Sequence, residues 1–403
     1  MFLVALLFAC GEDKSSTTAG CASDATYGES VLCTSWLINN ADTNSYIGSS
    51  VGVQSAEVDG DFMVIETSGI PDYNTTLSSA MVDALSNRPK AADDFASGAP
   101  TVATGDVVVF GQDIGYSNPN CDLGYWPPGP TCASDQASSV SIPLVPTPAN
   151  NTDCDTGAGS LGRWVTGVAI YGWSDTQSYD TAGNWSNVAV KLEAYDLDIC
   201  GGHAGFGGEY HHHGASECLR QAVGDDGGAH SGVWGIAGDG YPVYGPWFAD
   251  GVLAEPCWKA RDYASSETGC ADGKRSCHLV DAYDPSQGTV ATSTSGPDLD
   301  ASILSMSQNE FLAESGLFFQ DYYFDQACAE QGAQYLDEHN GHDHDDLGYH
   351  YHVTVEFNSA GLMVDKFPMH IGPTFAGELP SGSSSTCDTG TSGGPPNGGP
   401  PPQ

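Results

Sequence analysis

The segment that most constrains the fold is residues 348–357, in which aromatic and imidazole side chains alternate. In a β-strand, successive side chains point to opposite faces of the sheet. A strand here would place Tyr349 and Tyr351 on one face and His350 and His352 on the other. The tyrosine face continues through Val353, Val355 and Phe357, and the histidine face continues through Thr354 and Glu356. We expect the first face to pack in the core and the second to form a functional site.

A second segment, residues 209–213, repeats this pattern in part, because His211 and His213 share one face and Tyr210 and His212 share the other. Two histidines separated by one residue on a strand lie about 7 Å apart on the same side, so both rings can reach one ion. Two such pairs would supply four nitrogen ligands. Imidazole-rich sites suit copper, zinc or iron, and the pattern does not distinguish between these metals.

The sequence therefore predicts one transition-metal site formed by the two histidine-bearing strands. The predicted ligands are His203, Glu209, His211, His213, His350, His352 and Glu356. The residues predicted to orient these ligands are His230, Asp239, Tyr210, Tyr349 and Tyr351. All 12 histidines lie between His203 and His370, which favours a site over chance placement. Two alternatives stay open: a structural layer of hydrogen-bonded histidines and tyrosines, and a metal-free catalytic site.

Residues 337–346 form a second cluster of acidic residues and histidines around Asn340 and Gly341. Carboxylate oxygens in such a turn could hold calcium, although the spacing differs from that of an EF-hand. An exposed acidic loop is the alternative interpretation. His342 and His344 either extend the main site or are solvated.

The charge balance excludes one class of partner. The chain has 11 Lys and Arg against 52 Asp and Glu, a formal net charge of −41. Such a surface repels nucleic-acid phosphates and anionic lipid headgroups. We therefore expect no nucleic-acid partner, and a metal ion or small molecule is the expected ligand.

The N-terminus and the cysteines predict an exported protein. An apolar run ends at Cys10, which resembles a lipoprotein signal whose cysteine is lipidated and anchors the chain to a membrane. The other 12 of the 13 cysteines are an even number, as expected for disulfides in an oxidising compartment. A bridge between Cys200 and Cys218 would clamp the first histidine segment. We expect an outer-membrane lipoprotein at the cell surface or in the periplasm.

Short apolar runs rich in Val, Ile, Tyr and Phe, separated by Gly and Pro, predict a mainly β fold. We expect a single disulfide-containing domain, a β-sandwich or barrel-like fold with long loops. The one helix with a clear pattern is predicted at residues 300–315. The expected boundaries are a signal at 1–10, a polar tether at 11–50, the domain at 51–378 and a disordered tail at 379–403.

The order of motifs resembles that of the YHYH-domain family of exported bacterial proteins. The matching segments are residues 68–72, 167–171, 198–203, 210–213, 239–246, 336–341 and 348–354. His212 departs from the family pattern, which has tyrosine there. The resemblance implies export, a single domain and a role for the histidines and tyrosines, and it supplies no substrate.

Three functions remain open. The first is an extracytoplasmic protein that binds a transition metal. The second is a metal-dependent hydrolase or oxidoreductase, in which an open coordination position activates water or oxygen. The third is an adhesion or scaffold module with a structural layer of histidine and tyrosine. An open metal position in a cleft would favour the enzyme, and a closed site would favour a carrier.

Overall fold

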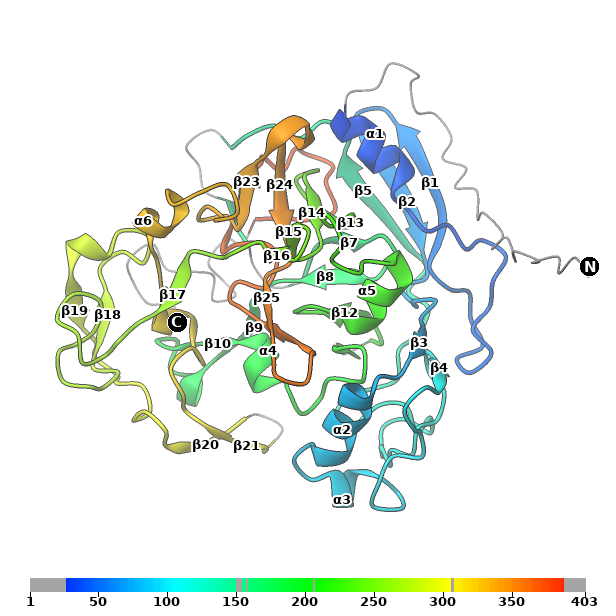
Figure 1. The fold of residues 1–403 in the computed structure, drawn as a ribbon, viewed down its shortest axis with the longest axis horizontal. Coiled ribbons are helices and arrows are strands. Elements are labelled where there is room, and N and C mark those ends of the chain that lie inside the picture. The colour runs from blue at the N-terminus through cyan, green and yellow to red at the C-terminus, as the bar shows by residue number, and fades with distance from the viewer. Residues whose placement is uncertain (1–26, 150–153, 157–158, 206, 306–307, 388–403) are drawn as a thin grey trace, which may run out of the picture.

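The computed structural model describes residues 27–149, 154–156, 159–205, 207–305 and 308–387. The protein is mainly β, as predicted, and its largest element is an eight-stranded sheet in the order β11-β12-β8-β7-β13-β14-β24-β23 (Figure 1). The strands of this sheet are β7 Ser160–Trp164, β8 Ala169–Tyr171, β11 Gly202–Ala204, β12 Tyr210–His212, β13 Val233–Ala237, β14 Pro242–Tyr244, β23 Gly341–Asp343 and β24 Tyr349–His352. Within the described residues, no helix is long and apolar enough to span a membrane.

The remaining elements are short. The α-helices are α1 Tyr27–Thr34, α2 Ser79–Asn87, α3 Ala91–Asp94, α4 Ala189–Leu192, α5 Glu217–Val223 and α6 Gln326–Ala329. Two-stranded sheets pair β3 Asn74–Thr76 with β4 Val107–Val109, β6 Cys154–Asp155 with β27 Thr374–Phe375, β9 Ser174–Ser178 with β10 Ser186–Val188, β15 Trp247–Ala249 with β16 Val252–Leu253, β17 Trp258–Ala260 with β22 Tyr322–Phe324, β18 Cys277–Leu279 with β19 Thr289–Ala291, β20 Ser302–Leu304 with β21 Glu310–Leu312, and β25 Val355–Phe357 with β26 Met363–Asp365.

A separate three-stranded sheet near the N-terminus consists of β1 Val53–Asp59, β2 Phe62–Thr67 and β5 Ser138–Pro143. The segment expected to be a polar tether contributes to its core, because Leu32 and Trp36 on and after α1 are buried against this sheet. The domain therefore includes residues from α1 onward. Cys10 lies outside the described residues.

The eight-stranded sheet consists of two halves with the same topology. Each half begins with an antiparallel hairpin, β7–β8 or β13–β14. The second strand of the hairpin pairs in parallel with a later strand, β12 or β24, and that strand pairs with an antiparallel edge strand, β11 or β23. The halves meet at β7 and β13, which are antiparallel. The sheet thus has an approximate internal two-fold repeat.

The register of the two halves agrees residue by residue. Gly162 pairs with Ile170 in the first half, and Gly235 pairs with Val243 in the second, each next to a bulge. Both glycines are needed for close approach of the halves. A Cβ on Gly162 would lie 2.2 Å from the carbonyl oxygen of Ile236, and a Cβ on Gly235 would lie 2.7 Å from a Trp164 ring atom. Equivalent glycines therefore allow β7 and β13 to pair at the centre of the sheet.

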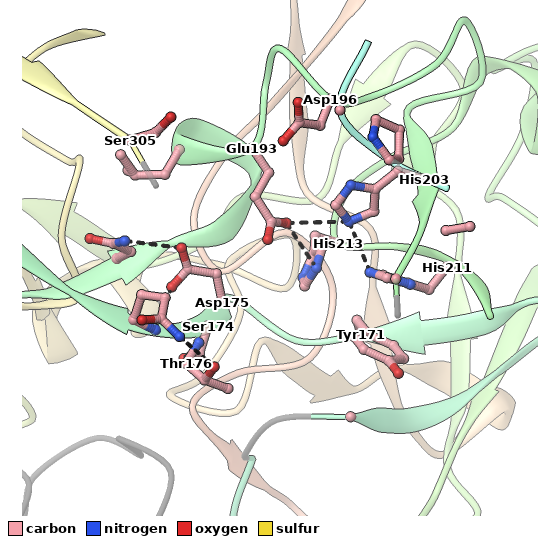
Figure 2. A pocket seen from close by; sticks show the side chains of 18 of the residues that line it. Tyr171, Ser174, Asp175, Thr176, Glu193, Asp196, His203, His211, His213 and Ser305 are labelled. Carbon is pink, nitrogen blue, oxygen red and sulfur yellow. Dashed lines mark hydrogen bonds and ion pairs between the residues drawn. The ribbon is translucent and has the colours of Figure 1, made fainter. Parts of the chain in front are cut away.

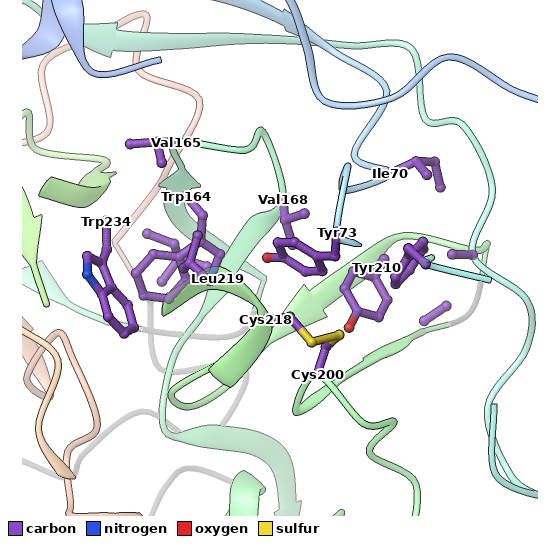
Figure 3. Close-up of a cluster of buried hydrophobic side chains, with 14 of the residues drawn as sticks. Ile70, Tyr73, Trp164, Val165, Val168, Cys200, Tyr210, Cys218, Leu219 and Trp234 are labelled. Atoms are coloured by element: carbon purple, nitrogen blue, oxygen red, sulfur yellow. A yellow bond between two sulfur atoms is a disulfide. The ribbon is translucent and has the colours of Figure 1, made fainter. Parts of the chain in front are cut away.

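The main core packs against both halves of the sheet, and Figure 3 shows part of it. Trp164, Tyr210 and Trp234 are fully buried within it, and the disulfide Cys200–Cys218 lies beside Tyr210. The predicted bridge is confirmed. The other disulfides in the described residues are Cys121–Cys132, Cys154–Cys387, Cys257–Cys328 and Cys270–Cys277.

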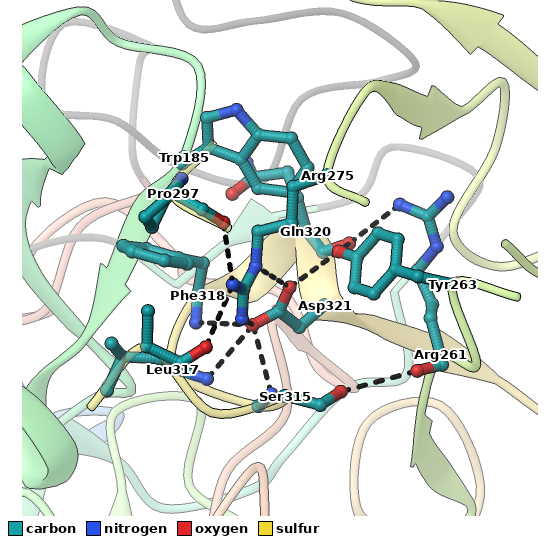
Figure 4. A network of polar contacts seen from close by, with 12 residues as sticks. Trp185, Arg261, Tyr263, Arg275, Pro297, Ser315, Leu317, Phe318, Gln320 and Asp321 are labelled. Atoms are coloured by element: carbon teal, nitrogen blue, oxygen red, sulfur yellow. Dashed lines mark hydrogen bonds and ion pairs between the residues drawn. The ribbon is translucent and has the colours of Figure 1, made fainter. Parts of the chain in front are cut away.

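The loops between β17 and β22 are organised around a buried ion pair (Figure 4). Arg275 donates to both carboxylate oxygens of Asp321 at 2.8 and 2.9 Å, and Tyr263 OH donates to the same carboxylate. Arg275 also donates to the carbonyl oxygens of Ala313 and Glu314. Satisfied in this way, the buried pair orders a region with few regular elements.

The helix predicted at residues 300–315 is wrong. The segment forms the hairpin β20–β21, in which Ile303 pairs with Phe311. Asp300, at the start of the predicted helix, has a positive φ of 60°. The apolar spacing fits both structures, and the contacts of Ala313 and Glu314 with Arg275 favour the extended one.

The tail predicted to be disordered begins at residue 379, but the ordered domain extends further along the chain. Cys387 is bridged to Cys154, and Ser384 donates its N–H to the carbonyl oxygen of Ser141. Residues 379–387 are therefore held against the domain. The cause is a long-range disulfide, which composition does not reveal. Residues 388–403 lie outside the described residues.

Candidate metal centres

The first group of histidines lies on the hairpin β11–β12 and just after it. His203 pairs with His211 across the hairpin, and His213 follows β12. One ring nitrogen from each lies within 4.8 Å of the others, and His203 Nε2 is 3.0 Å from His211 Nε2. All three side chains are buried. These residues are the first histidine group.

Backbone carbonyls orient two of these rings. His211 Nδ1 lies 3.1 Å from the Glu209 carbonyl oxygen, and His213 Nδ1 lies 2.6 Å from that of Gly172. A carbonyl oxygen only accepts, so Nδ1 carries the proton and Nε2 presents a lone pair to the group. Burial lowers the pKa of His203 to about 3 and that of His213 to about 4. The rings are therefore neutral at physiological pH.

Glu193, directly after α4, completes the first group. Its Oε2 lies 3.2 Å from His213 Nε2 and 3.4 Å from His203 Nε2 (Figure 2), yet no hydrogen bond reaches this buried oxygen. Burial, together with the negative charges of Asp175 and Asp196, raises the pKa of Glu193 to about 8. A carboxylate oxygen facing a nitrogen lone pair at this distance requires a proton or a cation between them.

A cavity of about 450 Å³ opens onto the first group. Its wall carries the carboxyl groups of Asp175, Glu193 and Asp196, together with the hydroxyl groups of Ser174 and Thr176 (Figure 2). Among the described residues, no lysine or arginine lines it. The group thus lies at the end of a polar, acidic cavity that a small molecule could enter.

The second group lies in the other half of the sheet. Four histidines there each place a nitrogen within 4.8 Å of the others: His230, His342, His344 and His350. His342 pairs with His350 across the hairpin β23–β24, and their Nε2 atoms are 3.1 Å apart. The ring of His352 is next to them, with its centroid 5.0 Å from that of His350. Burial lowers the pKa of His350 to about 3 and that of His342 to about 4.

The two groups occupy equivalent positions in the two-fold repeat. In the first half His203 pairs with His211, and in the second His342 pairs with His350. The backbone of Gly172 accepts from His213 at 2.6 Å, and the equivalent backbone of Gly245 accepts from His352 at 2.7 Å. Each half thus positions three rings in the same way.

The residues behind the rings are also repeated. Tyr210 OH donates to Asp198 at 2.8 Å, and Tyr349 OH donates to Asp337 at 2.9 Å. Asp198 also accepts the N–H of Gly202, as Asp337 accepts that of Gly341, so each aspartate fixes the start of its hairpin. Burial raises the pKa of Asp198 to about 7.

The prediction of a single site formed by both histidine pairs needs correction. Four strands separate β12 from β24 in the sheet, a spacing of about 24 Å along the sheet. His211 and His213 therefore belong to one group, and His350 and His352 lie at another. Spacing in the sequence could not distinguish neighbouring strands from equivalent ones.

The other predicted ligands lie apart from both groups. The side chain of Glu209 accepts from Tyr171 OH at 2.8 Å and pairs with Arg163, and only its backbone contacts a histidine. Glu356 is exposed on β25. Strand β24 ends at His352 and a new strand begins at Val355, so the alternation of side chains does not continue to Glu356. Asp239 accepts from Tyr351 OH at 2.6 Å and supports no histidine of either group.

Three predicted supporting residues have the positions that the alternation implies. Tyr210 and Tyr351 are fully buried in the core, and Tyr349 packs against it. His212, which replaces a tyrosine, is also fully buried, and its ring stacks on Tyr73 at 6.1 Å between centroids. His230 is different, because it joins the second group directly.

Sequence reasoning missed Glu193 altogether. It lies outside both motifs, and a single glutamate in residues 188–195 carries no signal. Calcium binding by the loop at residues 337–346 stays a prediction. Asp337 receives hydrogen bonds from Tyr349 OH and from the N–H groups of His339 and Gly341, so its oxygens face their own loop.

The fold and the paired histidine groups define a mainly β, disulfide-bonded protein with two buried clusters of imidazoles. The sequence matches the YHYH protein family over residues 139–365, more than half of the chain, and the chain belongs to this family. Comparison with curated proteins and with solved structures finds no significant match.

Proposed function

We propose that the first histidine group and Glu193 hold a transition-metal ion and that the protein is an exported metalloprotein. The observation that carries this proposal is the contact of His213 with Glu193. His213 Nε2 presents a lone pair, because Nδ1 donates to Gly172, and Glu193 Oε2 faces it at 3.2 Å without a hydrogen bond. A metal ion satisfies both groups, and it displaces the proton that Glu193 retains in the metal-free protein.

Three imidazoles and one carboxylate suit zinc or iron. Strands position His203 and His211, and a backbone carbonyl orients His213, so little reorganisation accompanies binding. In the purely structural alternative, Glu193 must keep its proton, because only a proton between Oε2 and His213 Nε2 then satisfies both buried atoms.

A metal-dependent hydrolase or oxidoreductase is the second candidate function, and the cavity supports it. A metal held by the first group would have coordination positions directed at a space of about 450 Å³. Asp175 and Asp196 lie in the same wall and would accept the proton of a metal-bound water. A carrier site needs no such cavity.

The proposed location is outside the cytoplasm, with Cys10 as the lipid-bearing residue. Disulfides such as Cys200–Cys218 and Cys257–Cys328 are typical of oxidising compartments and support export. Membrane fractionation of cells expressing the wild type and Cys10→Ser tests the anchor. The variant should move to the soluble fraction, and retention in the membrane would contradict lipidation.

Metal analysis of protein purified without a histidine tag tests the metal proposal. We compare the wild type with His211→Ala/Glu193→Gln, and His278→Gln serves as the control because His278 belongs to neither group. The double variant should lose one metal ion per chain, and the control should lose none. Equal metal content in the wild type and the double variant would refute the proposal.

A further inference from the structure

The second histidine group has a feature that the first group lacks. His342 Nδ1 lies 2.6 Å from the carbonyl oxygen of Ala333, and His350 Nδ1 lies 2.7 Å from that of Gly348. Both Nδ1 atoms must therefore carry protons, and both Nε2 atoms carry lone pairs. These lone pairs face each other at 3.1 Å. Two neutral rings in these tautomers cannot form a hydrogen bond, so the contact is repulsive unless a cation lies beside it.

His352 gives independent support. Its Nδ1 donates to Gly245 at 2.7 Å, so its Nε2 also carries a lone pair. This Nε2 is buried and has no hydrogen-bond partner. The His352 ring centroid lies 5.0 to 5.2 Å from those of His350, His342 and His230. A buried, unpartnered nitrogen thus lies next to the two opposed lone pairs.

His230 and His344 enclose the same space from two loops. His230 precedes β13, and its Nδ1 lies 2.8 Å from the carbonyl oxygen of Ser231, which again directs the Nε2 lone pair away from the backbone. His344 lies between β23 and the 3₁₀ turn Asp345–Leu347. The two rings stack with 5.6 Å between centroids.

We infer that His230, His342, His344 and His350, with His352 beside them, form a second metal site that takes a copper ion. The ligand set consists only of imidazoles, whereas the first group includes Glu193. Among divalent first-row metals, affinity for nitrogen ligands is highest for Cu²⁺, and imidazole is a good copper ligand. The proposal uses none of the residues of the first group, so either can fail alone.

Copper titration of the full-length, untagged protein tests the inference, with excess glycine present to remove copper held weakly by the acidic surface. Electron paramagnetic resonance of the bound Cu²⁺ should show coupling to several nitrogen atoms. His342→Gln and His344→Gln should each weaken copper binding by more than about tenfold, because each removes one ligand. His211→Ala, in the first group, should leave the copper spectrum unchanged.

His339→Gln is the matched control. His339 lies in the loop that leads into β23, close in sequence to His342, but its Nδ1 faces Thr374 and it belongs to neither group. The control should bind copper as the wild type does. Circular dichroism establishes that each variant is folded.

Two outcomes would overturn the inference. The first is wild-type protein that takes up no copper in glycine, or copper binding that both His342→Gln and His344→Gln retain. The second is a copper signal that His211→Ala abolishes and His344→Gln preserves, which would place copper at the first group and leave only the proposed function standing.

Discussion

The disulfide Cys200–Cys218 should affect the first metal site more than the disulfide Cys257–Cys328 does, although it should contribute less to the stability of the fold. It joins the turn that leads into β11 to α5, and all three histidines of the first group lie between its two cysteines. β11 is an edge strand, and on its outer side the hairpin is held by an isolated β-bridge between Ala204 and Thr131. Edge elements open locally at lower free energy than central ones. Cys200→Ala/Cys218→Ala should therefore let the histidines separate while the rest of the sheet stays folded.

The magnitude follows from the length of the loop. A bridge across 18 residues contributes about 3.2 kcal/mol to the free energy of unfolding in the loop-entropy description. Cys257–Cys328 spans 71 residues and should contribute about 4.4 kcal/mol. Both bridges are buried, so the cavities left by alanine are similar. The control variant Cys257→Ala/Cys328→Ala should thus lose more stability than the test variant.

Metal affinity should change in the opposite order. Loosening the hairpin should weaken binding at the first group by roughly tenfold, as loss of a supporting contact does in other metal sites. The control removes a bridge in a different hydrophobic cluster, which contains none of the histidines. Urea unfolding of the metal-free proteins measures stability, and competition with a chelator measures affinity. Equal affinity in the two double variants would refute the clamp, and so would a loss that simply followed stability.

Three further predictions can be tested in the same assays. Gly162→Ala should cost about 3 kcal/mol or more in urea unfolding, because its Cβ would lie 2.2 Å from the Ile236 carbonyl oxygen at the junction of the halves. Asp198→Asn should weaken metal binding about tenfold at the first group only, and Asp337→Asn at the second only, since each carboxylate fixes one hairpin. Burial lowers the pKa of His278 to about 4, so the unfolded chain binds more protons below pH 6.5 and stability falls as pH falls from there toward 4. After allowance for partial exposure, His278→Gln should remove roughly 2 kcal/mol of that loss, and an unchanged pH profile would contradict this assignment.

Local alternation predicted the two faces of β24 correctly. Tyr351 is fully buried in the core, and His350 faces the second group, as period two requires. The same rule failed beyond His352, where β24 ends and Glu356 becomes exposed on another strand. Alternation describes side chains only while the strand continues, and nothing in the residue pattern marks where it stops.

The residues that lie next to each histidine pair in space could not be predicted. The sequence contains two histidine pairs, and a single site is the simplest arrangement of them. Whether β12 lies beside β24 depends on the order of strands, which contacts between distant segments determine. The contact between Glu193 and His213 could not be predicted for the same reason, because α4 brings Glu193 to His213 from outside both motifs. Long-range topology, rather than local pattern, thus decides the composition of each site.

The two-fold repeat separates what the fold provides from what each half adds. The shared features are those that orient rings: the paired histidines, the glycine carbonyl that holds Nδ1, and the tyrosine and aspartate behind the hairpin. The features that differ are the additional donors, which are Glu193 in the first half and His230 with His344 in the second. The repeated unit is therefore a holder for three imidazoles, and its chemistry depends on neighbouring loops. The Tyr-His-Tyr-His motif alone consequently identifies the holder and leaves the metal and the reaction to residues that lie outside it.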